Sequence, residues 1–210
     1  MPKKVDHHAR RTQIADALLR IAATHGLQAI SLRHVAAEAG VSAGMVQHYF
    51  RTKDKMMTFA LEVVSDNVQA RLAAGAADLD DADSPKAVVR ALLVQMLPLD
   101  EARRLEGHVG LAFHAYAAIR PAMADQLRAD AELLLAFLAD RIRAAQRSGD
   151  APATLDPAGA AITLLALVEG LSMQVLVRYY PPETALDIFD AHLCTVFDPP
   201  PDDRARGTVG

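Results

Sequence analysis

The feature that most constrains this 210-residue chain is a pair of short amphipathic helices separated by a glycine, which the sequence predicts between Ser31 and Lys55. Ser31 and Ser42 each precede an apolar helical pattern, and serine is a favoured N-cap because its hydroxyl accepts a hydrogen bond from the first turn. Gly40 lies between the two patterns, where the chain must leave the first helix with a positive φ angle. This is the layout of a helix-turn-helix, whose second helix enters a DNA major groove.

The second short helix is predicted over residues 43–50, with Val46 and Phe50 on its apolar side. Gln47 can form a bidentate pair with adenine, and Met45 can contact a thymine methyl group. Small residues at the start of this helix allow its backbone to approach base edges, and the basic residues that follow can neutralise phosphates. The residues expected to contact DNA are Ser31, Arg33, Ser42, Ala43, Gly44, Met45, Gln47, His48, Tyr49, Thr52 and Lys53.

A longer amphipathic helix is predicted over residues 10–25, and Gly26 ends it. The segments that follow in order are His25-Gly26-Leu27, Ser31-Leu32, Val35-Ala36, Glu38-Ala39-Gly40-Val41-Ser42, Gly44, Tyr49-Phe50 and Lys53. This order and spacing, over residues 10–60, resembles the N-terminal domain of the tetracycline-repressor (TetR) family. The family commonly has an aromatic residue at the position of Gln47, so a polar residue followed by His48-Tyr49-Phe50 is more similar to its betaine-responsive branch.

The resemblance implies an all-α fold of about nine helices, with an N-terminal three-helix helix-turn-helix domain and a C-terminal helical bundle. It also implies a homodimer that is released from DNA by a small molecule. The expected domains are a DNA-binding domain (1–55), a ligand-binding and dimerisation domain (56–198) and a disordered tail (199–210). In the body, helices are predicted over residues 52–74, 85–97, 100–119, 121–147, 157–180 and 183–197, with an acidic loop at 78–83.

The charge distribution agrees with DNA binding at the N-terminal end. Residues 1–55 contain nine Lys or Arg and four Asp or Glu, a net charge of +5, whereas the whole chain carries −4, which leaves −9 for residues 56–210. A basic end on an acidic body steers that end toward nucleic acid. An N-terminal arm could add DNA contacts, and a solvated tail is the alternative. The basic residues of this arm are Lys3, Lys4, Arg10 and Arg11.

The helix predicted over residues 157–180 is apolar almost all round, so both of its sides must be buried. In a body of this size we expect one side to face a second subunit, and the alternative is the core of a monomer. The resemblance likewise implies pairing through the two C-terminal helices. The residues expected at this dimer interface are Leu164, Leu167, Leu171, Val175 and Leu193.

Polar residues interrupt the longest apolar stretch, so we expect a buried helix and no contact with a membrane. The only cysteine, Cys194, cannot form an intrachain disulfide, and no signal peptide is recognisable, which favours a cytoplasmic protein.

An effector pocket is expected in the body, where Glu169 places a carboxylate on an apolar helix face. It could bind a cationic or hydroxylated ligand, and the alternative is a structural role. The absence of Trp argues against a full aromatic cage for a quaternary ammonium. The expected pocket residues are Met96, Val109, Phe113, Tyr116, Glu169 and Met173.

No motif for hydrolysis, nucleotide binding or a metal centre is present, so we expect neither an enzyme nor a cofactor or metal site. The sequence predicts a transcriptional regulator, most simply a repressor, that binds a palindromic double-stranded DNA operator as a homodimer and is released by an unknown small-molecule effector. The alternative is an all-helical small-molecule carrier or protein-interaction module, which would leave the Ser31–Lys55 pattern without a use.

Overall fold

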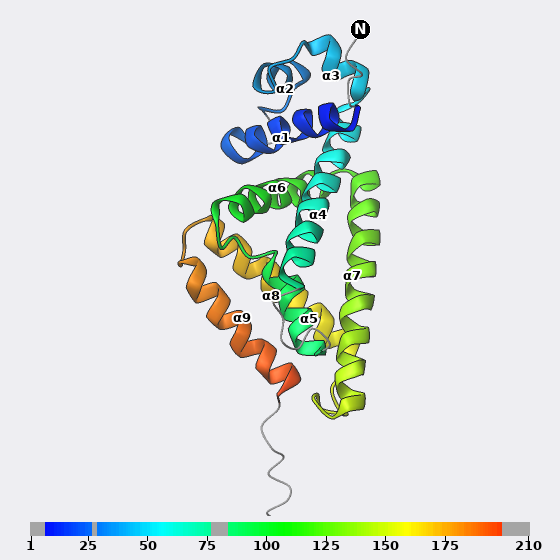
Figure 1. The fold of residues 1–210 in the computed structure, drawn as a ribbon, viewed down its shortest axis with the longest axis vertical. Helices are drawn as coiled ribbons and strands as arrows, with labels where there is room; N and C mark the ends of the chain where they lie inside the picture. Colours follow the sequence, from blue (N-terminus) through cyan, green and yellow to red (C-terminus); the bar gives the residue numbers. More distant parts are fainter. Residues whose placement is uncertain (1–6, 27–28, 77–83, 199–210) are drawn as a thin grey trace, which may run out of the picture. The chain divides into compact units, whose positions relative to one another are not determined.

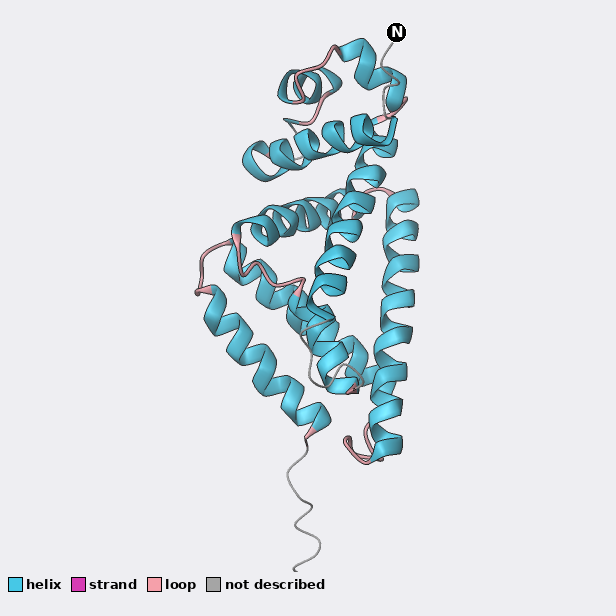
Figure 2. Ribbon diagram, viewed as in Figure 1, coloured by secondary structure: helices cyan, strands magenta, loops and turns pink. Residues whose placement is uncertain are grey.

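The computed structural model describes residues 7–26, 29–76 and 84–198, and within these ranges every regular element is an α-helix (Figures 1 and 2). The all-α expectation is therefore confirmed. Lys3, Lys4, the acidic loop 78–83 and the tail 199–210 lie outside the described residues. The helices are α1 (His7–His25), α2 (Leu32–Glu38), α3 (Ala43–Tyr49), α4 (Lys53–Ala76), α5 (Pro85–Val94), α6 (Glu101–Ala117), α7 (Pro121–Ser148), α8 (Pro157–Leu176) and α9 (Pro182–Phe197).

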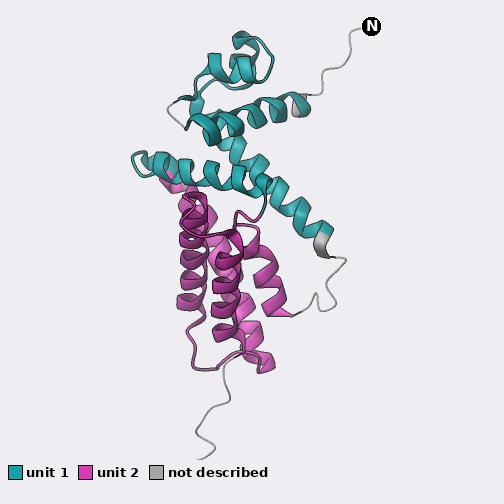
Figure 3. Cartoon of the chain, turned by 90° about the vertical axis from the view of Figure 1, so that its left-hand side faces the viewer, with its two compact units in different colours: residues 1–77, 100–123 teal, residues 78–99, 124–210 magenta. Residues whose placement is uncertain are grey.

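Contacts divide the chain into two compact units (Figure 3). Unit 1 comprises residues 1–77 and 100–123, and unit 2 comprises residues 78–99 and 124–210. Helices α4 and α6 therefore belong with the N-terminal helices. The boundary expected after residue 55, between a DNA-binding and a ligand-binding domain, falls inside unit 1. It stays a prediction about which residues serve which function.

In unit 1, helix α1 packs against α2, α4 and α6. Its apolar stripe, which includes Ile14 and Leu18, is buried as the periodicity predicts. The guanidinium of Arg11 lies 4.0 Å from the ring centroid of Phe59 on α4. Arg11 and Arg10 are residues of the helix itself, so the expectation that they belong to an N-terminal arm is wrong. Arg11 instead joins α1 to α4 by a cation–π contact.

In unit 2, helix α8 packs against α5 and α9 and supplies much of the core. Four of the residues expected at a dimer interface are buried in this core, and Leu167 packs against it half-buried. The four buried side chains are covered by the chain's own helices, so they are corrected from interface to core residues, whereas an interface role for Leu167 stays a prediction. The four buried residues are Leu164, Leu171, Val175 and Leu193.

Helix α8 is also long and apolar enough to cross a membrane by length and composition, and no other helix in the described parts of the chain is. A core helix of a folded domain passes the same test. Its buried contacts with α5 and α9 agree with the expectation of a core helix.

Two predicted helices are too long at their C-terminal ends. Helix α5 ends at Val94, and the next residues form tighter turns in which Leu97 N–H donates to the Val94 carbonyl (3.1 Å). Pro98 explains this, because the residue before a proline is disfavoured in a helix. Helix α8 ends at Leu176, where Tyr179 N–H donates to the Gln174 carbonyl (2.9 Å).

The end of α8 is a Schellman motif without a glycine. Arg178 occupies its left-handed position with φ = 60°, and its N–H donates to the Val175 carbonyl (3.0 Å). An L-residue with a side chain is strained in this conformation, which costs roughly 1 kcal/mol. The sequence offers no glycine there, which is why the helix end could not be placed.

Replacing Arg178 by glycine should relieve this strain and raise the free energy of unfolding by about 0.5–1 kcal/mol. The measurement is denaturant unfolding followed by circular dichroism. Val177→Gly is the matched control, because Val177 has an ordinary φ of −83° and should lose stability. Equal effects of the two substitutions would contradict the strain argument.

Candidate nucleic-acid interface

The turn between α2 and α3 is fixed by backbone geometry at Gly40. Its φ is 66°, and Val41 N–H donates to the Ala36 carbonyl (2.9 Å) while Gly40 N–H donates to the Ala37 carbonyl (3.2 Å). This is a Schellman motif, which needs a left-handed residue at the position of the glycine. The prediction of a positive φ at Gly40 is confirmed.

A side chain from α1 holds this turn in place. The Gln13 side-chain amide donates to the Ala39 carbonyl (2.7 Å), and its oxygen accepts a hydrogen bond from Arg10 (2.6 Å). The sequence analysis missed Gln13, because one glutamine on the polar side of an amphipathic helix carries no signal for a partner 26 residues away. This bond ties the turn of the helix-turn-helix to α1.

Three hydroxyl groups cap the helices of the candidate interface. Ser31 Oγ accepts from His34 N–H (3.2 Å), Ser42 Oγ accepts from Met45 N–H (3.1 Å), and Thr52 Oγ1 accepts from Lys55 N–H (3.2 Å). Both predicted serine N-caps are therefore confirmed. Each capping hydroxyl uses its oxygen as the acceptor, so its hydrogen remains able to donate to a phosphate.

Helix α3 separates its buried and exposed sides as predicted. Val46 is buried, and Phe50 is buried with its ring centroid 5.5 Å from that of Phe59. Of the eleven residues expected to contact DNA, nine are exposed, and Tyr49 and Lys53 are half-buried. The exposed residues of α3 and its cap are Ser42, Ala43, Gly44, Met45, Gln47 and His48, and those outside it are Ser31, Arg33 and Thr52.

Gly44 keeps the start of α3 open. A Cβ atom built there would have only Ser42 Oγ within reach, at 4.0 Å, so packing does not require a glycine. The open surface instead leaves the helix backbone approachable from outside, as a helix lying in a major groove needs.

Tyr116, one of the expected pocket residues, contacts the start of α4, and its role in a pocket stays a prediction. Its hydroxyl donates to Asp54 Oδ1 (2.7 Å) in the first turn of α4, and the guanidinium of Arg120 lies 3.9 Å from its ring centroid. Burial raises the pKa of the Tyr116 hydroxyl, and the hydrogen bond to Asp54 raises it further. Tyr116 is thus part of a charged cluster at the start of α4.

The other expected pocket residues are divided between the two units. Val109 and Phe113 are buried in α6, and Met96 packs half-buried against the core of unit 2. Glu169 and Met173 are exposed on α8. The pocket that this set was expected to line stays a prediction.

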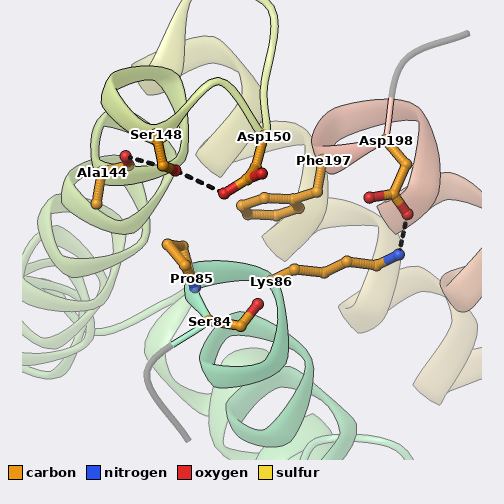
Figure 4. A pocket seen from close by; sticks show the side chains of 8 residues that line it. All are labelled: Ser84, Pro85, Lys86, Ala144, Ser148, Asp150, Phe197 and Asp198. Atoms are coloured by element: carbon orange, nitrogen blue, oxygen red, sulfur yellow. Dashed lines mark hydrogen bonds and ion pairs between the residues drawn. The ribbon is translucent and has the colours of Figure 1, made fainter. Parts of the chain in front are cut away.

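Unit 2 contains a cavity of about 480 Å³ at the C-terminal ends of α7 and α9 and the start of α5 (Figure 4). Lys86 pairs with Asp198, and Ser148 Oγ donates to Asp150 (2.6 Å). Four of its polar side chains thus pair with one another, and none of the expected pocket residues lines it. The lining residues are Ser84, Pro85, Lys86, Ala144, Ser148, Asp150, Phe197 and Asp198.

Within the described ranges, no group of three or more His, Cys, Asp or Glu side chains is arranged to hold a metal ion.

A capped, exposed recognition helix on a three-helix lobe defines the class of helix-turn-helix DNA-binding regulators. The chain belongs to the TetR family of bacterial transcriptional regulators, and it is not an enzyme. The model described as "Bacterial regulatory proteins, tetR family" matches residues 14–58, and that described as "BetI-type transcriptional repressor, C-terminal" matches residues 85–198. The resemblance to the betaine-responsive branch is thereby confirmed.

Individual relatives agree with this assignment. The transcriptional regulator PksA of Bacillus subtilis is 34% identical, covering 84% of this chain and 83% of its own length. The crystal structure of a transcriptional regulator from Rhodococcus sp. Rha1 is similar with a TM-score of 0.76 and 34% identity, covering 89% of this chain and 95% of that one. A Saccharomonospora viridis regulator in complex with choline has a TM-score of 0.75 over 88% of this chain and 95% of that one, and its 22% identity shows the fold alone.

Gly44→Ala should separate folding from DNA binding. Alanine favours the helix by up to about 1 kcal/mol, so the melting temperature should rise, whereas the added methyl group on the exposed backbone should weaken binding to an operator. The measurements are thermal unfolding and fluorescence anisotropy with labelled DNA.

Gly110→Ala is the matched control, because Gly110 lies in α6, outside the helix-turn-helix, and a Cβ atom there meets nothing within 4 Å. It should stabilise the fold without changing operator affinity. Undiminished operator binding by the Gly44 variant would argue against close approach of the α3 backbone to DNA.

Proposed function

We propose that this regulator binds a palindromic operator as a homodimer and represses transcription until a small-molecule effector releases it. The observation that carries the proposal is the exposed face of α3, whose polar and small side chains are displayed while Val46 and Phe50 are buried. A homodimer would place two recognition helices about one DNA turn apart, which matches the symmetry of a palindrome. We propose that the regulator acts in the cytoplasm.

In this proposal Gln47 and Met45 read base edges and Arg33, Thr52 and Lys53 contact phosphates. Gln47 is exposed near the middle of α3, where a side chain of a recognition helix reaches the groove floor. Lys53 and Thr52 stand at the start of α4, and Arg33 is exposed in the first turn of α2. Ser31, Ser42, Ala43, Gly44, His48 and Tyr49 complete the proposed contact surface.

The dimer contact is proposed on the solvent-exposed face of α8. This face is opposite the buried residues, such as Leu164 and Leu171, that the sequence analysis expected at the interface. Ile162 is 56% exposed and Met173 is 43% exposed, and both lie on one side of the helix with Ala166 and Glu169. On α9, Ile188 is 42% exposed. Large apolar side chains exposed at helical spacing on two adjacent helices support an interface between copies of this chain.

An effector is proposed on the strength of the C-terminal match to a BetI-type repressor. A ligand that binds better to a conformer with mis-spaced recognition helices would shift the population away from operator binding. A small-molecule carrier remains the other reading of the helical body, but it gives the exposed face of α3 no role.

Selection of operators from random duplex DNA by the purified protein tests the function. A palindrome with half-sites about 10 base pairs apart, or a longer overlapping version, is expected from a dimeric groove reader. No enriched sequence at low salt would refute operator binding and favour the carrier.

Substitutions at Gln47 and Lys53 should have different effects on the selected DNA. Gln47→Ala should relax the preference at one base position and cost about 1–3 kcal/mol there. Lys53→Ala should weaken binding to all sequences alike and lower the salt dependence by about one phosphate contact. An identical selected sequence for the Gln47 variant, or unchanged affinity for the Lys53 variant, would remove that residue from the proposed interface.

Ile162→Glu should disrupt the proposed dimer, because it places a charge in an apolar contact. Sedimentation should then give a monomer with a native circular dichroism spectrum and weaker operator binding. Leu133→Glu is the control, since Leu133 is 73% exposed on α7, outside the proposed interface. If both variants remain dimeric, the outward face of α8 is not the contact.

A further inference from the structure

The first turn of α4 contains an acidic residue directly after a lysine that is proposed to bind DNA. Asp54 is exposed and Lys53 is half-buried, and the two share the N-terminal turn of α4. A carboxylate favours that position for the helix, because it interacts with the partial positive charge of the N-terminus. For DNA binding it is unfavourable, because it repels phosphate and competes with phosphate for the lysine.

Two residues from the end of α6 and just beyond it engage this carboxylate. The Tyr116 hydroxyl donates to Asp54 Oδ1 (2.7 Å), and Arg120 Nη1 lies 3.7 Å from the same oxygen. Arg120 also donates to the Tyr116 hydroxyl oxygen, and its guanidinium stacks on the ring 3.9 Å from the centroid. Asp54 thus has a hydrogen-bond donor and a positive charge supplied from more than 60 residues away in the sequence.

Lys53 stands against the same cluster. Its amine lies 5.8 Å from the centroid of the Tyr116 ring, within the range of a cation–π contact. Burial lowers the pKa of Lys53, and the charge of Arg120 lowers it further, against a smaller opposing effect of Asp54. The pKa of Lys53 is therefore lowered both by burial and by the like charge of Arg120.

We propose that Arg120 and Tyr116 are positioning residues for operator binding, which pair with Asp54 and so prevent its carboxylate from competing with a DNA phosphate for Lys53. The inference rests on the operator binding proposed above. It explains how α4 keeps a stabilising acid in its first turn while presenting net positive charge beside the helix-turn-helix. Lys53 and Arg120 outweigh Asp54 by one positive charge.

The test is a double-mutant cycle read by operator affinity as a function of salt, using the full-length protein and its selected operator. Arg120→Ala should weaken binding about tenfold and lower the salt slope by about one, because Asp54 then pairs with Lys53. Tyr116→Phe should cause a smaller loss of affinity. Asp54→Asn in the Arg120→Ala background should restore wild-type affinity, since no carboxylate remains to compete.

Arg104→Ala is the matched control, because it also removes a positive charge, here from α6. Arg104 forms an ion pair with Glu101 (3.7 Å) and not with Asp54. It should leave both affinity and salt slope unchanged. Thermal unfolding of each variant separates a loss of fold from a loss of binding.

Failure of Asp54→Asn to restore binding would overturn the proposal, since Arg120 would then act on DNA directly or through the fold. Unchanged affinity of the Arg120→Ala variant would overturn it as well. A failure of the proposed operator binding can be distinguished from a failure of this inference, because in the first case the unsubstituted protein would select no DNA sequence.

Discussion

The direction in which α3 leaves α2 depends on the left-handed backbone of Gly40. A residue with a side chain would be strained there by roughly 1 kcal/mol or more, and two hydrogen bonds of the Schellman motif depend on that geometry. Helix α3 has seven residues, too few to be stable alone in water, so it is helical only because Val46 and Phe50 are packed. The position of every exposed side chain of α3 therefore depends on the turn, which Gln13 holds from α1.

Sequence signals that act over a few residues predicted the structure well. The serine caps, the glycine at the turn, and the buried positions of α3 are each decided by neighbours within one helical turn, and all are confirmed. The same local reasoning failed where a residue took an unusual conformation, as Arg178 does in the left-handed region. It failed for Leu164 and Leu171 because a helix that is apolar all round does not reveal which side faces its own core.

The partner of Tyr116 shows what local sequence signals cannot give. Its apolar ring and polar tip suit a ligand pocket, and only the folded chain brings its hydroxyl to Asp54. Gln13 was missed for the same reason, since its partner Ala39 lies at the end of α2, 26 residues further along the chain. Of the candidate interface, the exposed side chains of α3 could be predicted, whereas the side chains that hold them could not, because long-range pairs leave no periodic pattern in a single sequence.

The exposed apolar face of α8 has a consequence for how much of this regulator a cell must make. In the proposed dimer Ile162 and Met173 are buried only against a second copy, so the chain would gain stability as its concentration rises. While dimers are scarce, their number grows with the square of the amount of protein, and so does occupancy of an operator that only dimers hold. In this proposal, repression would begin over a narrower range of protein abundance than for a regulator that binds as a monomer.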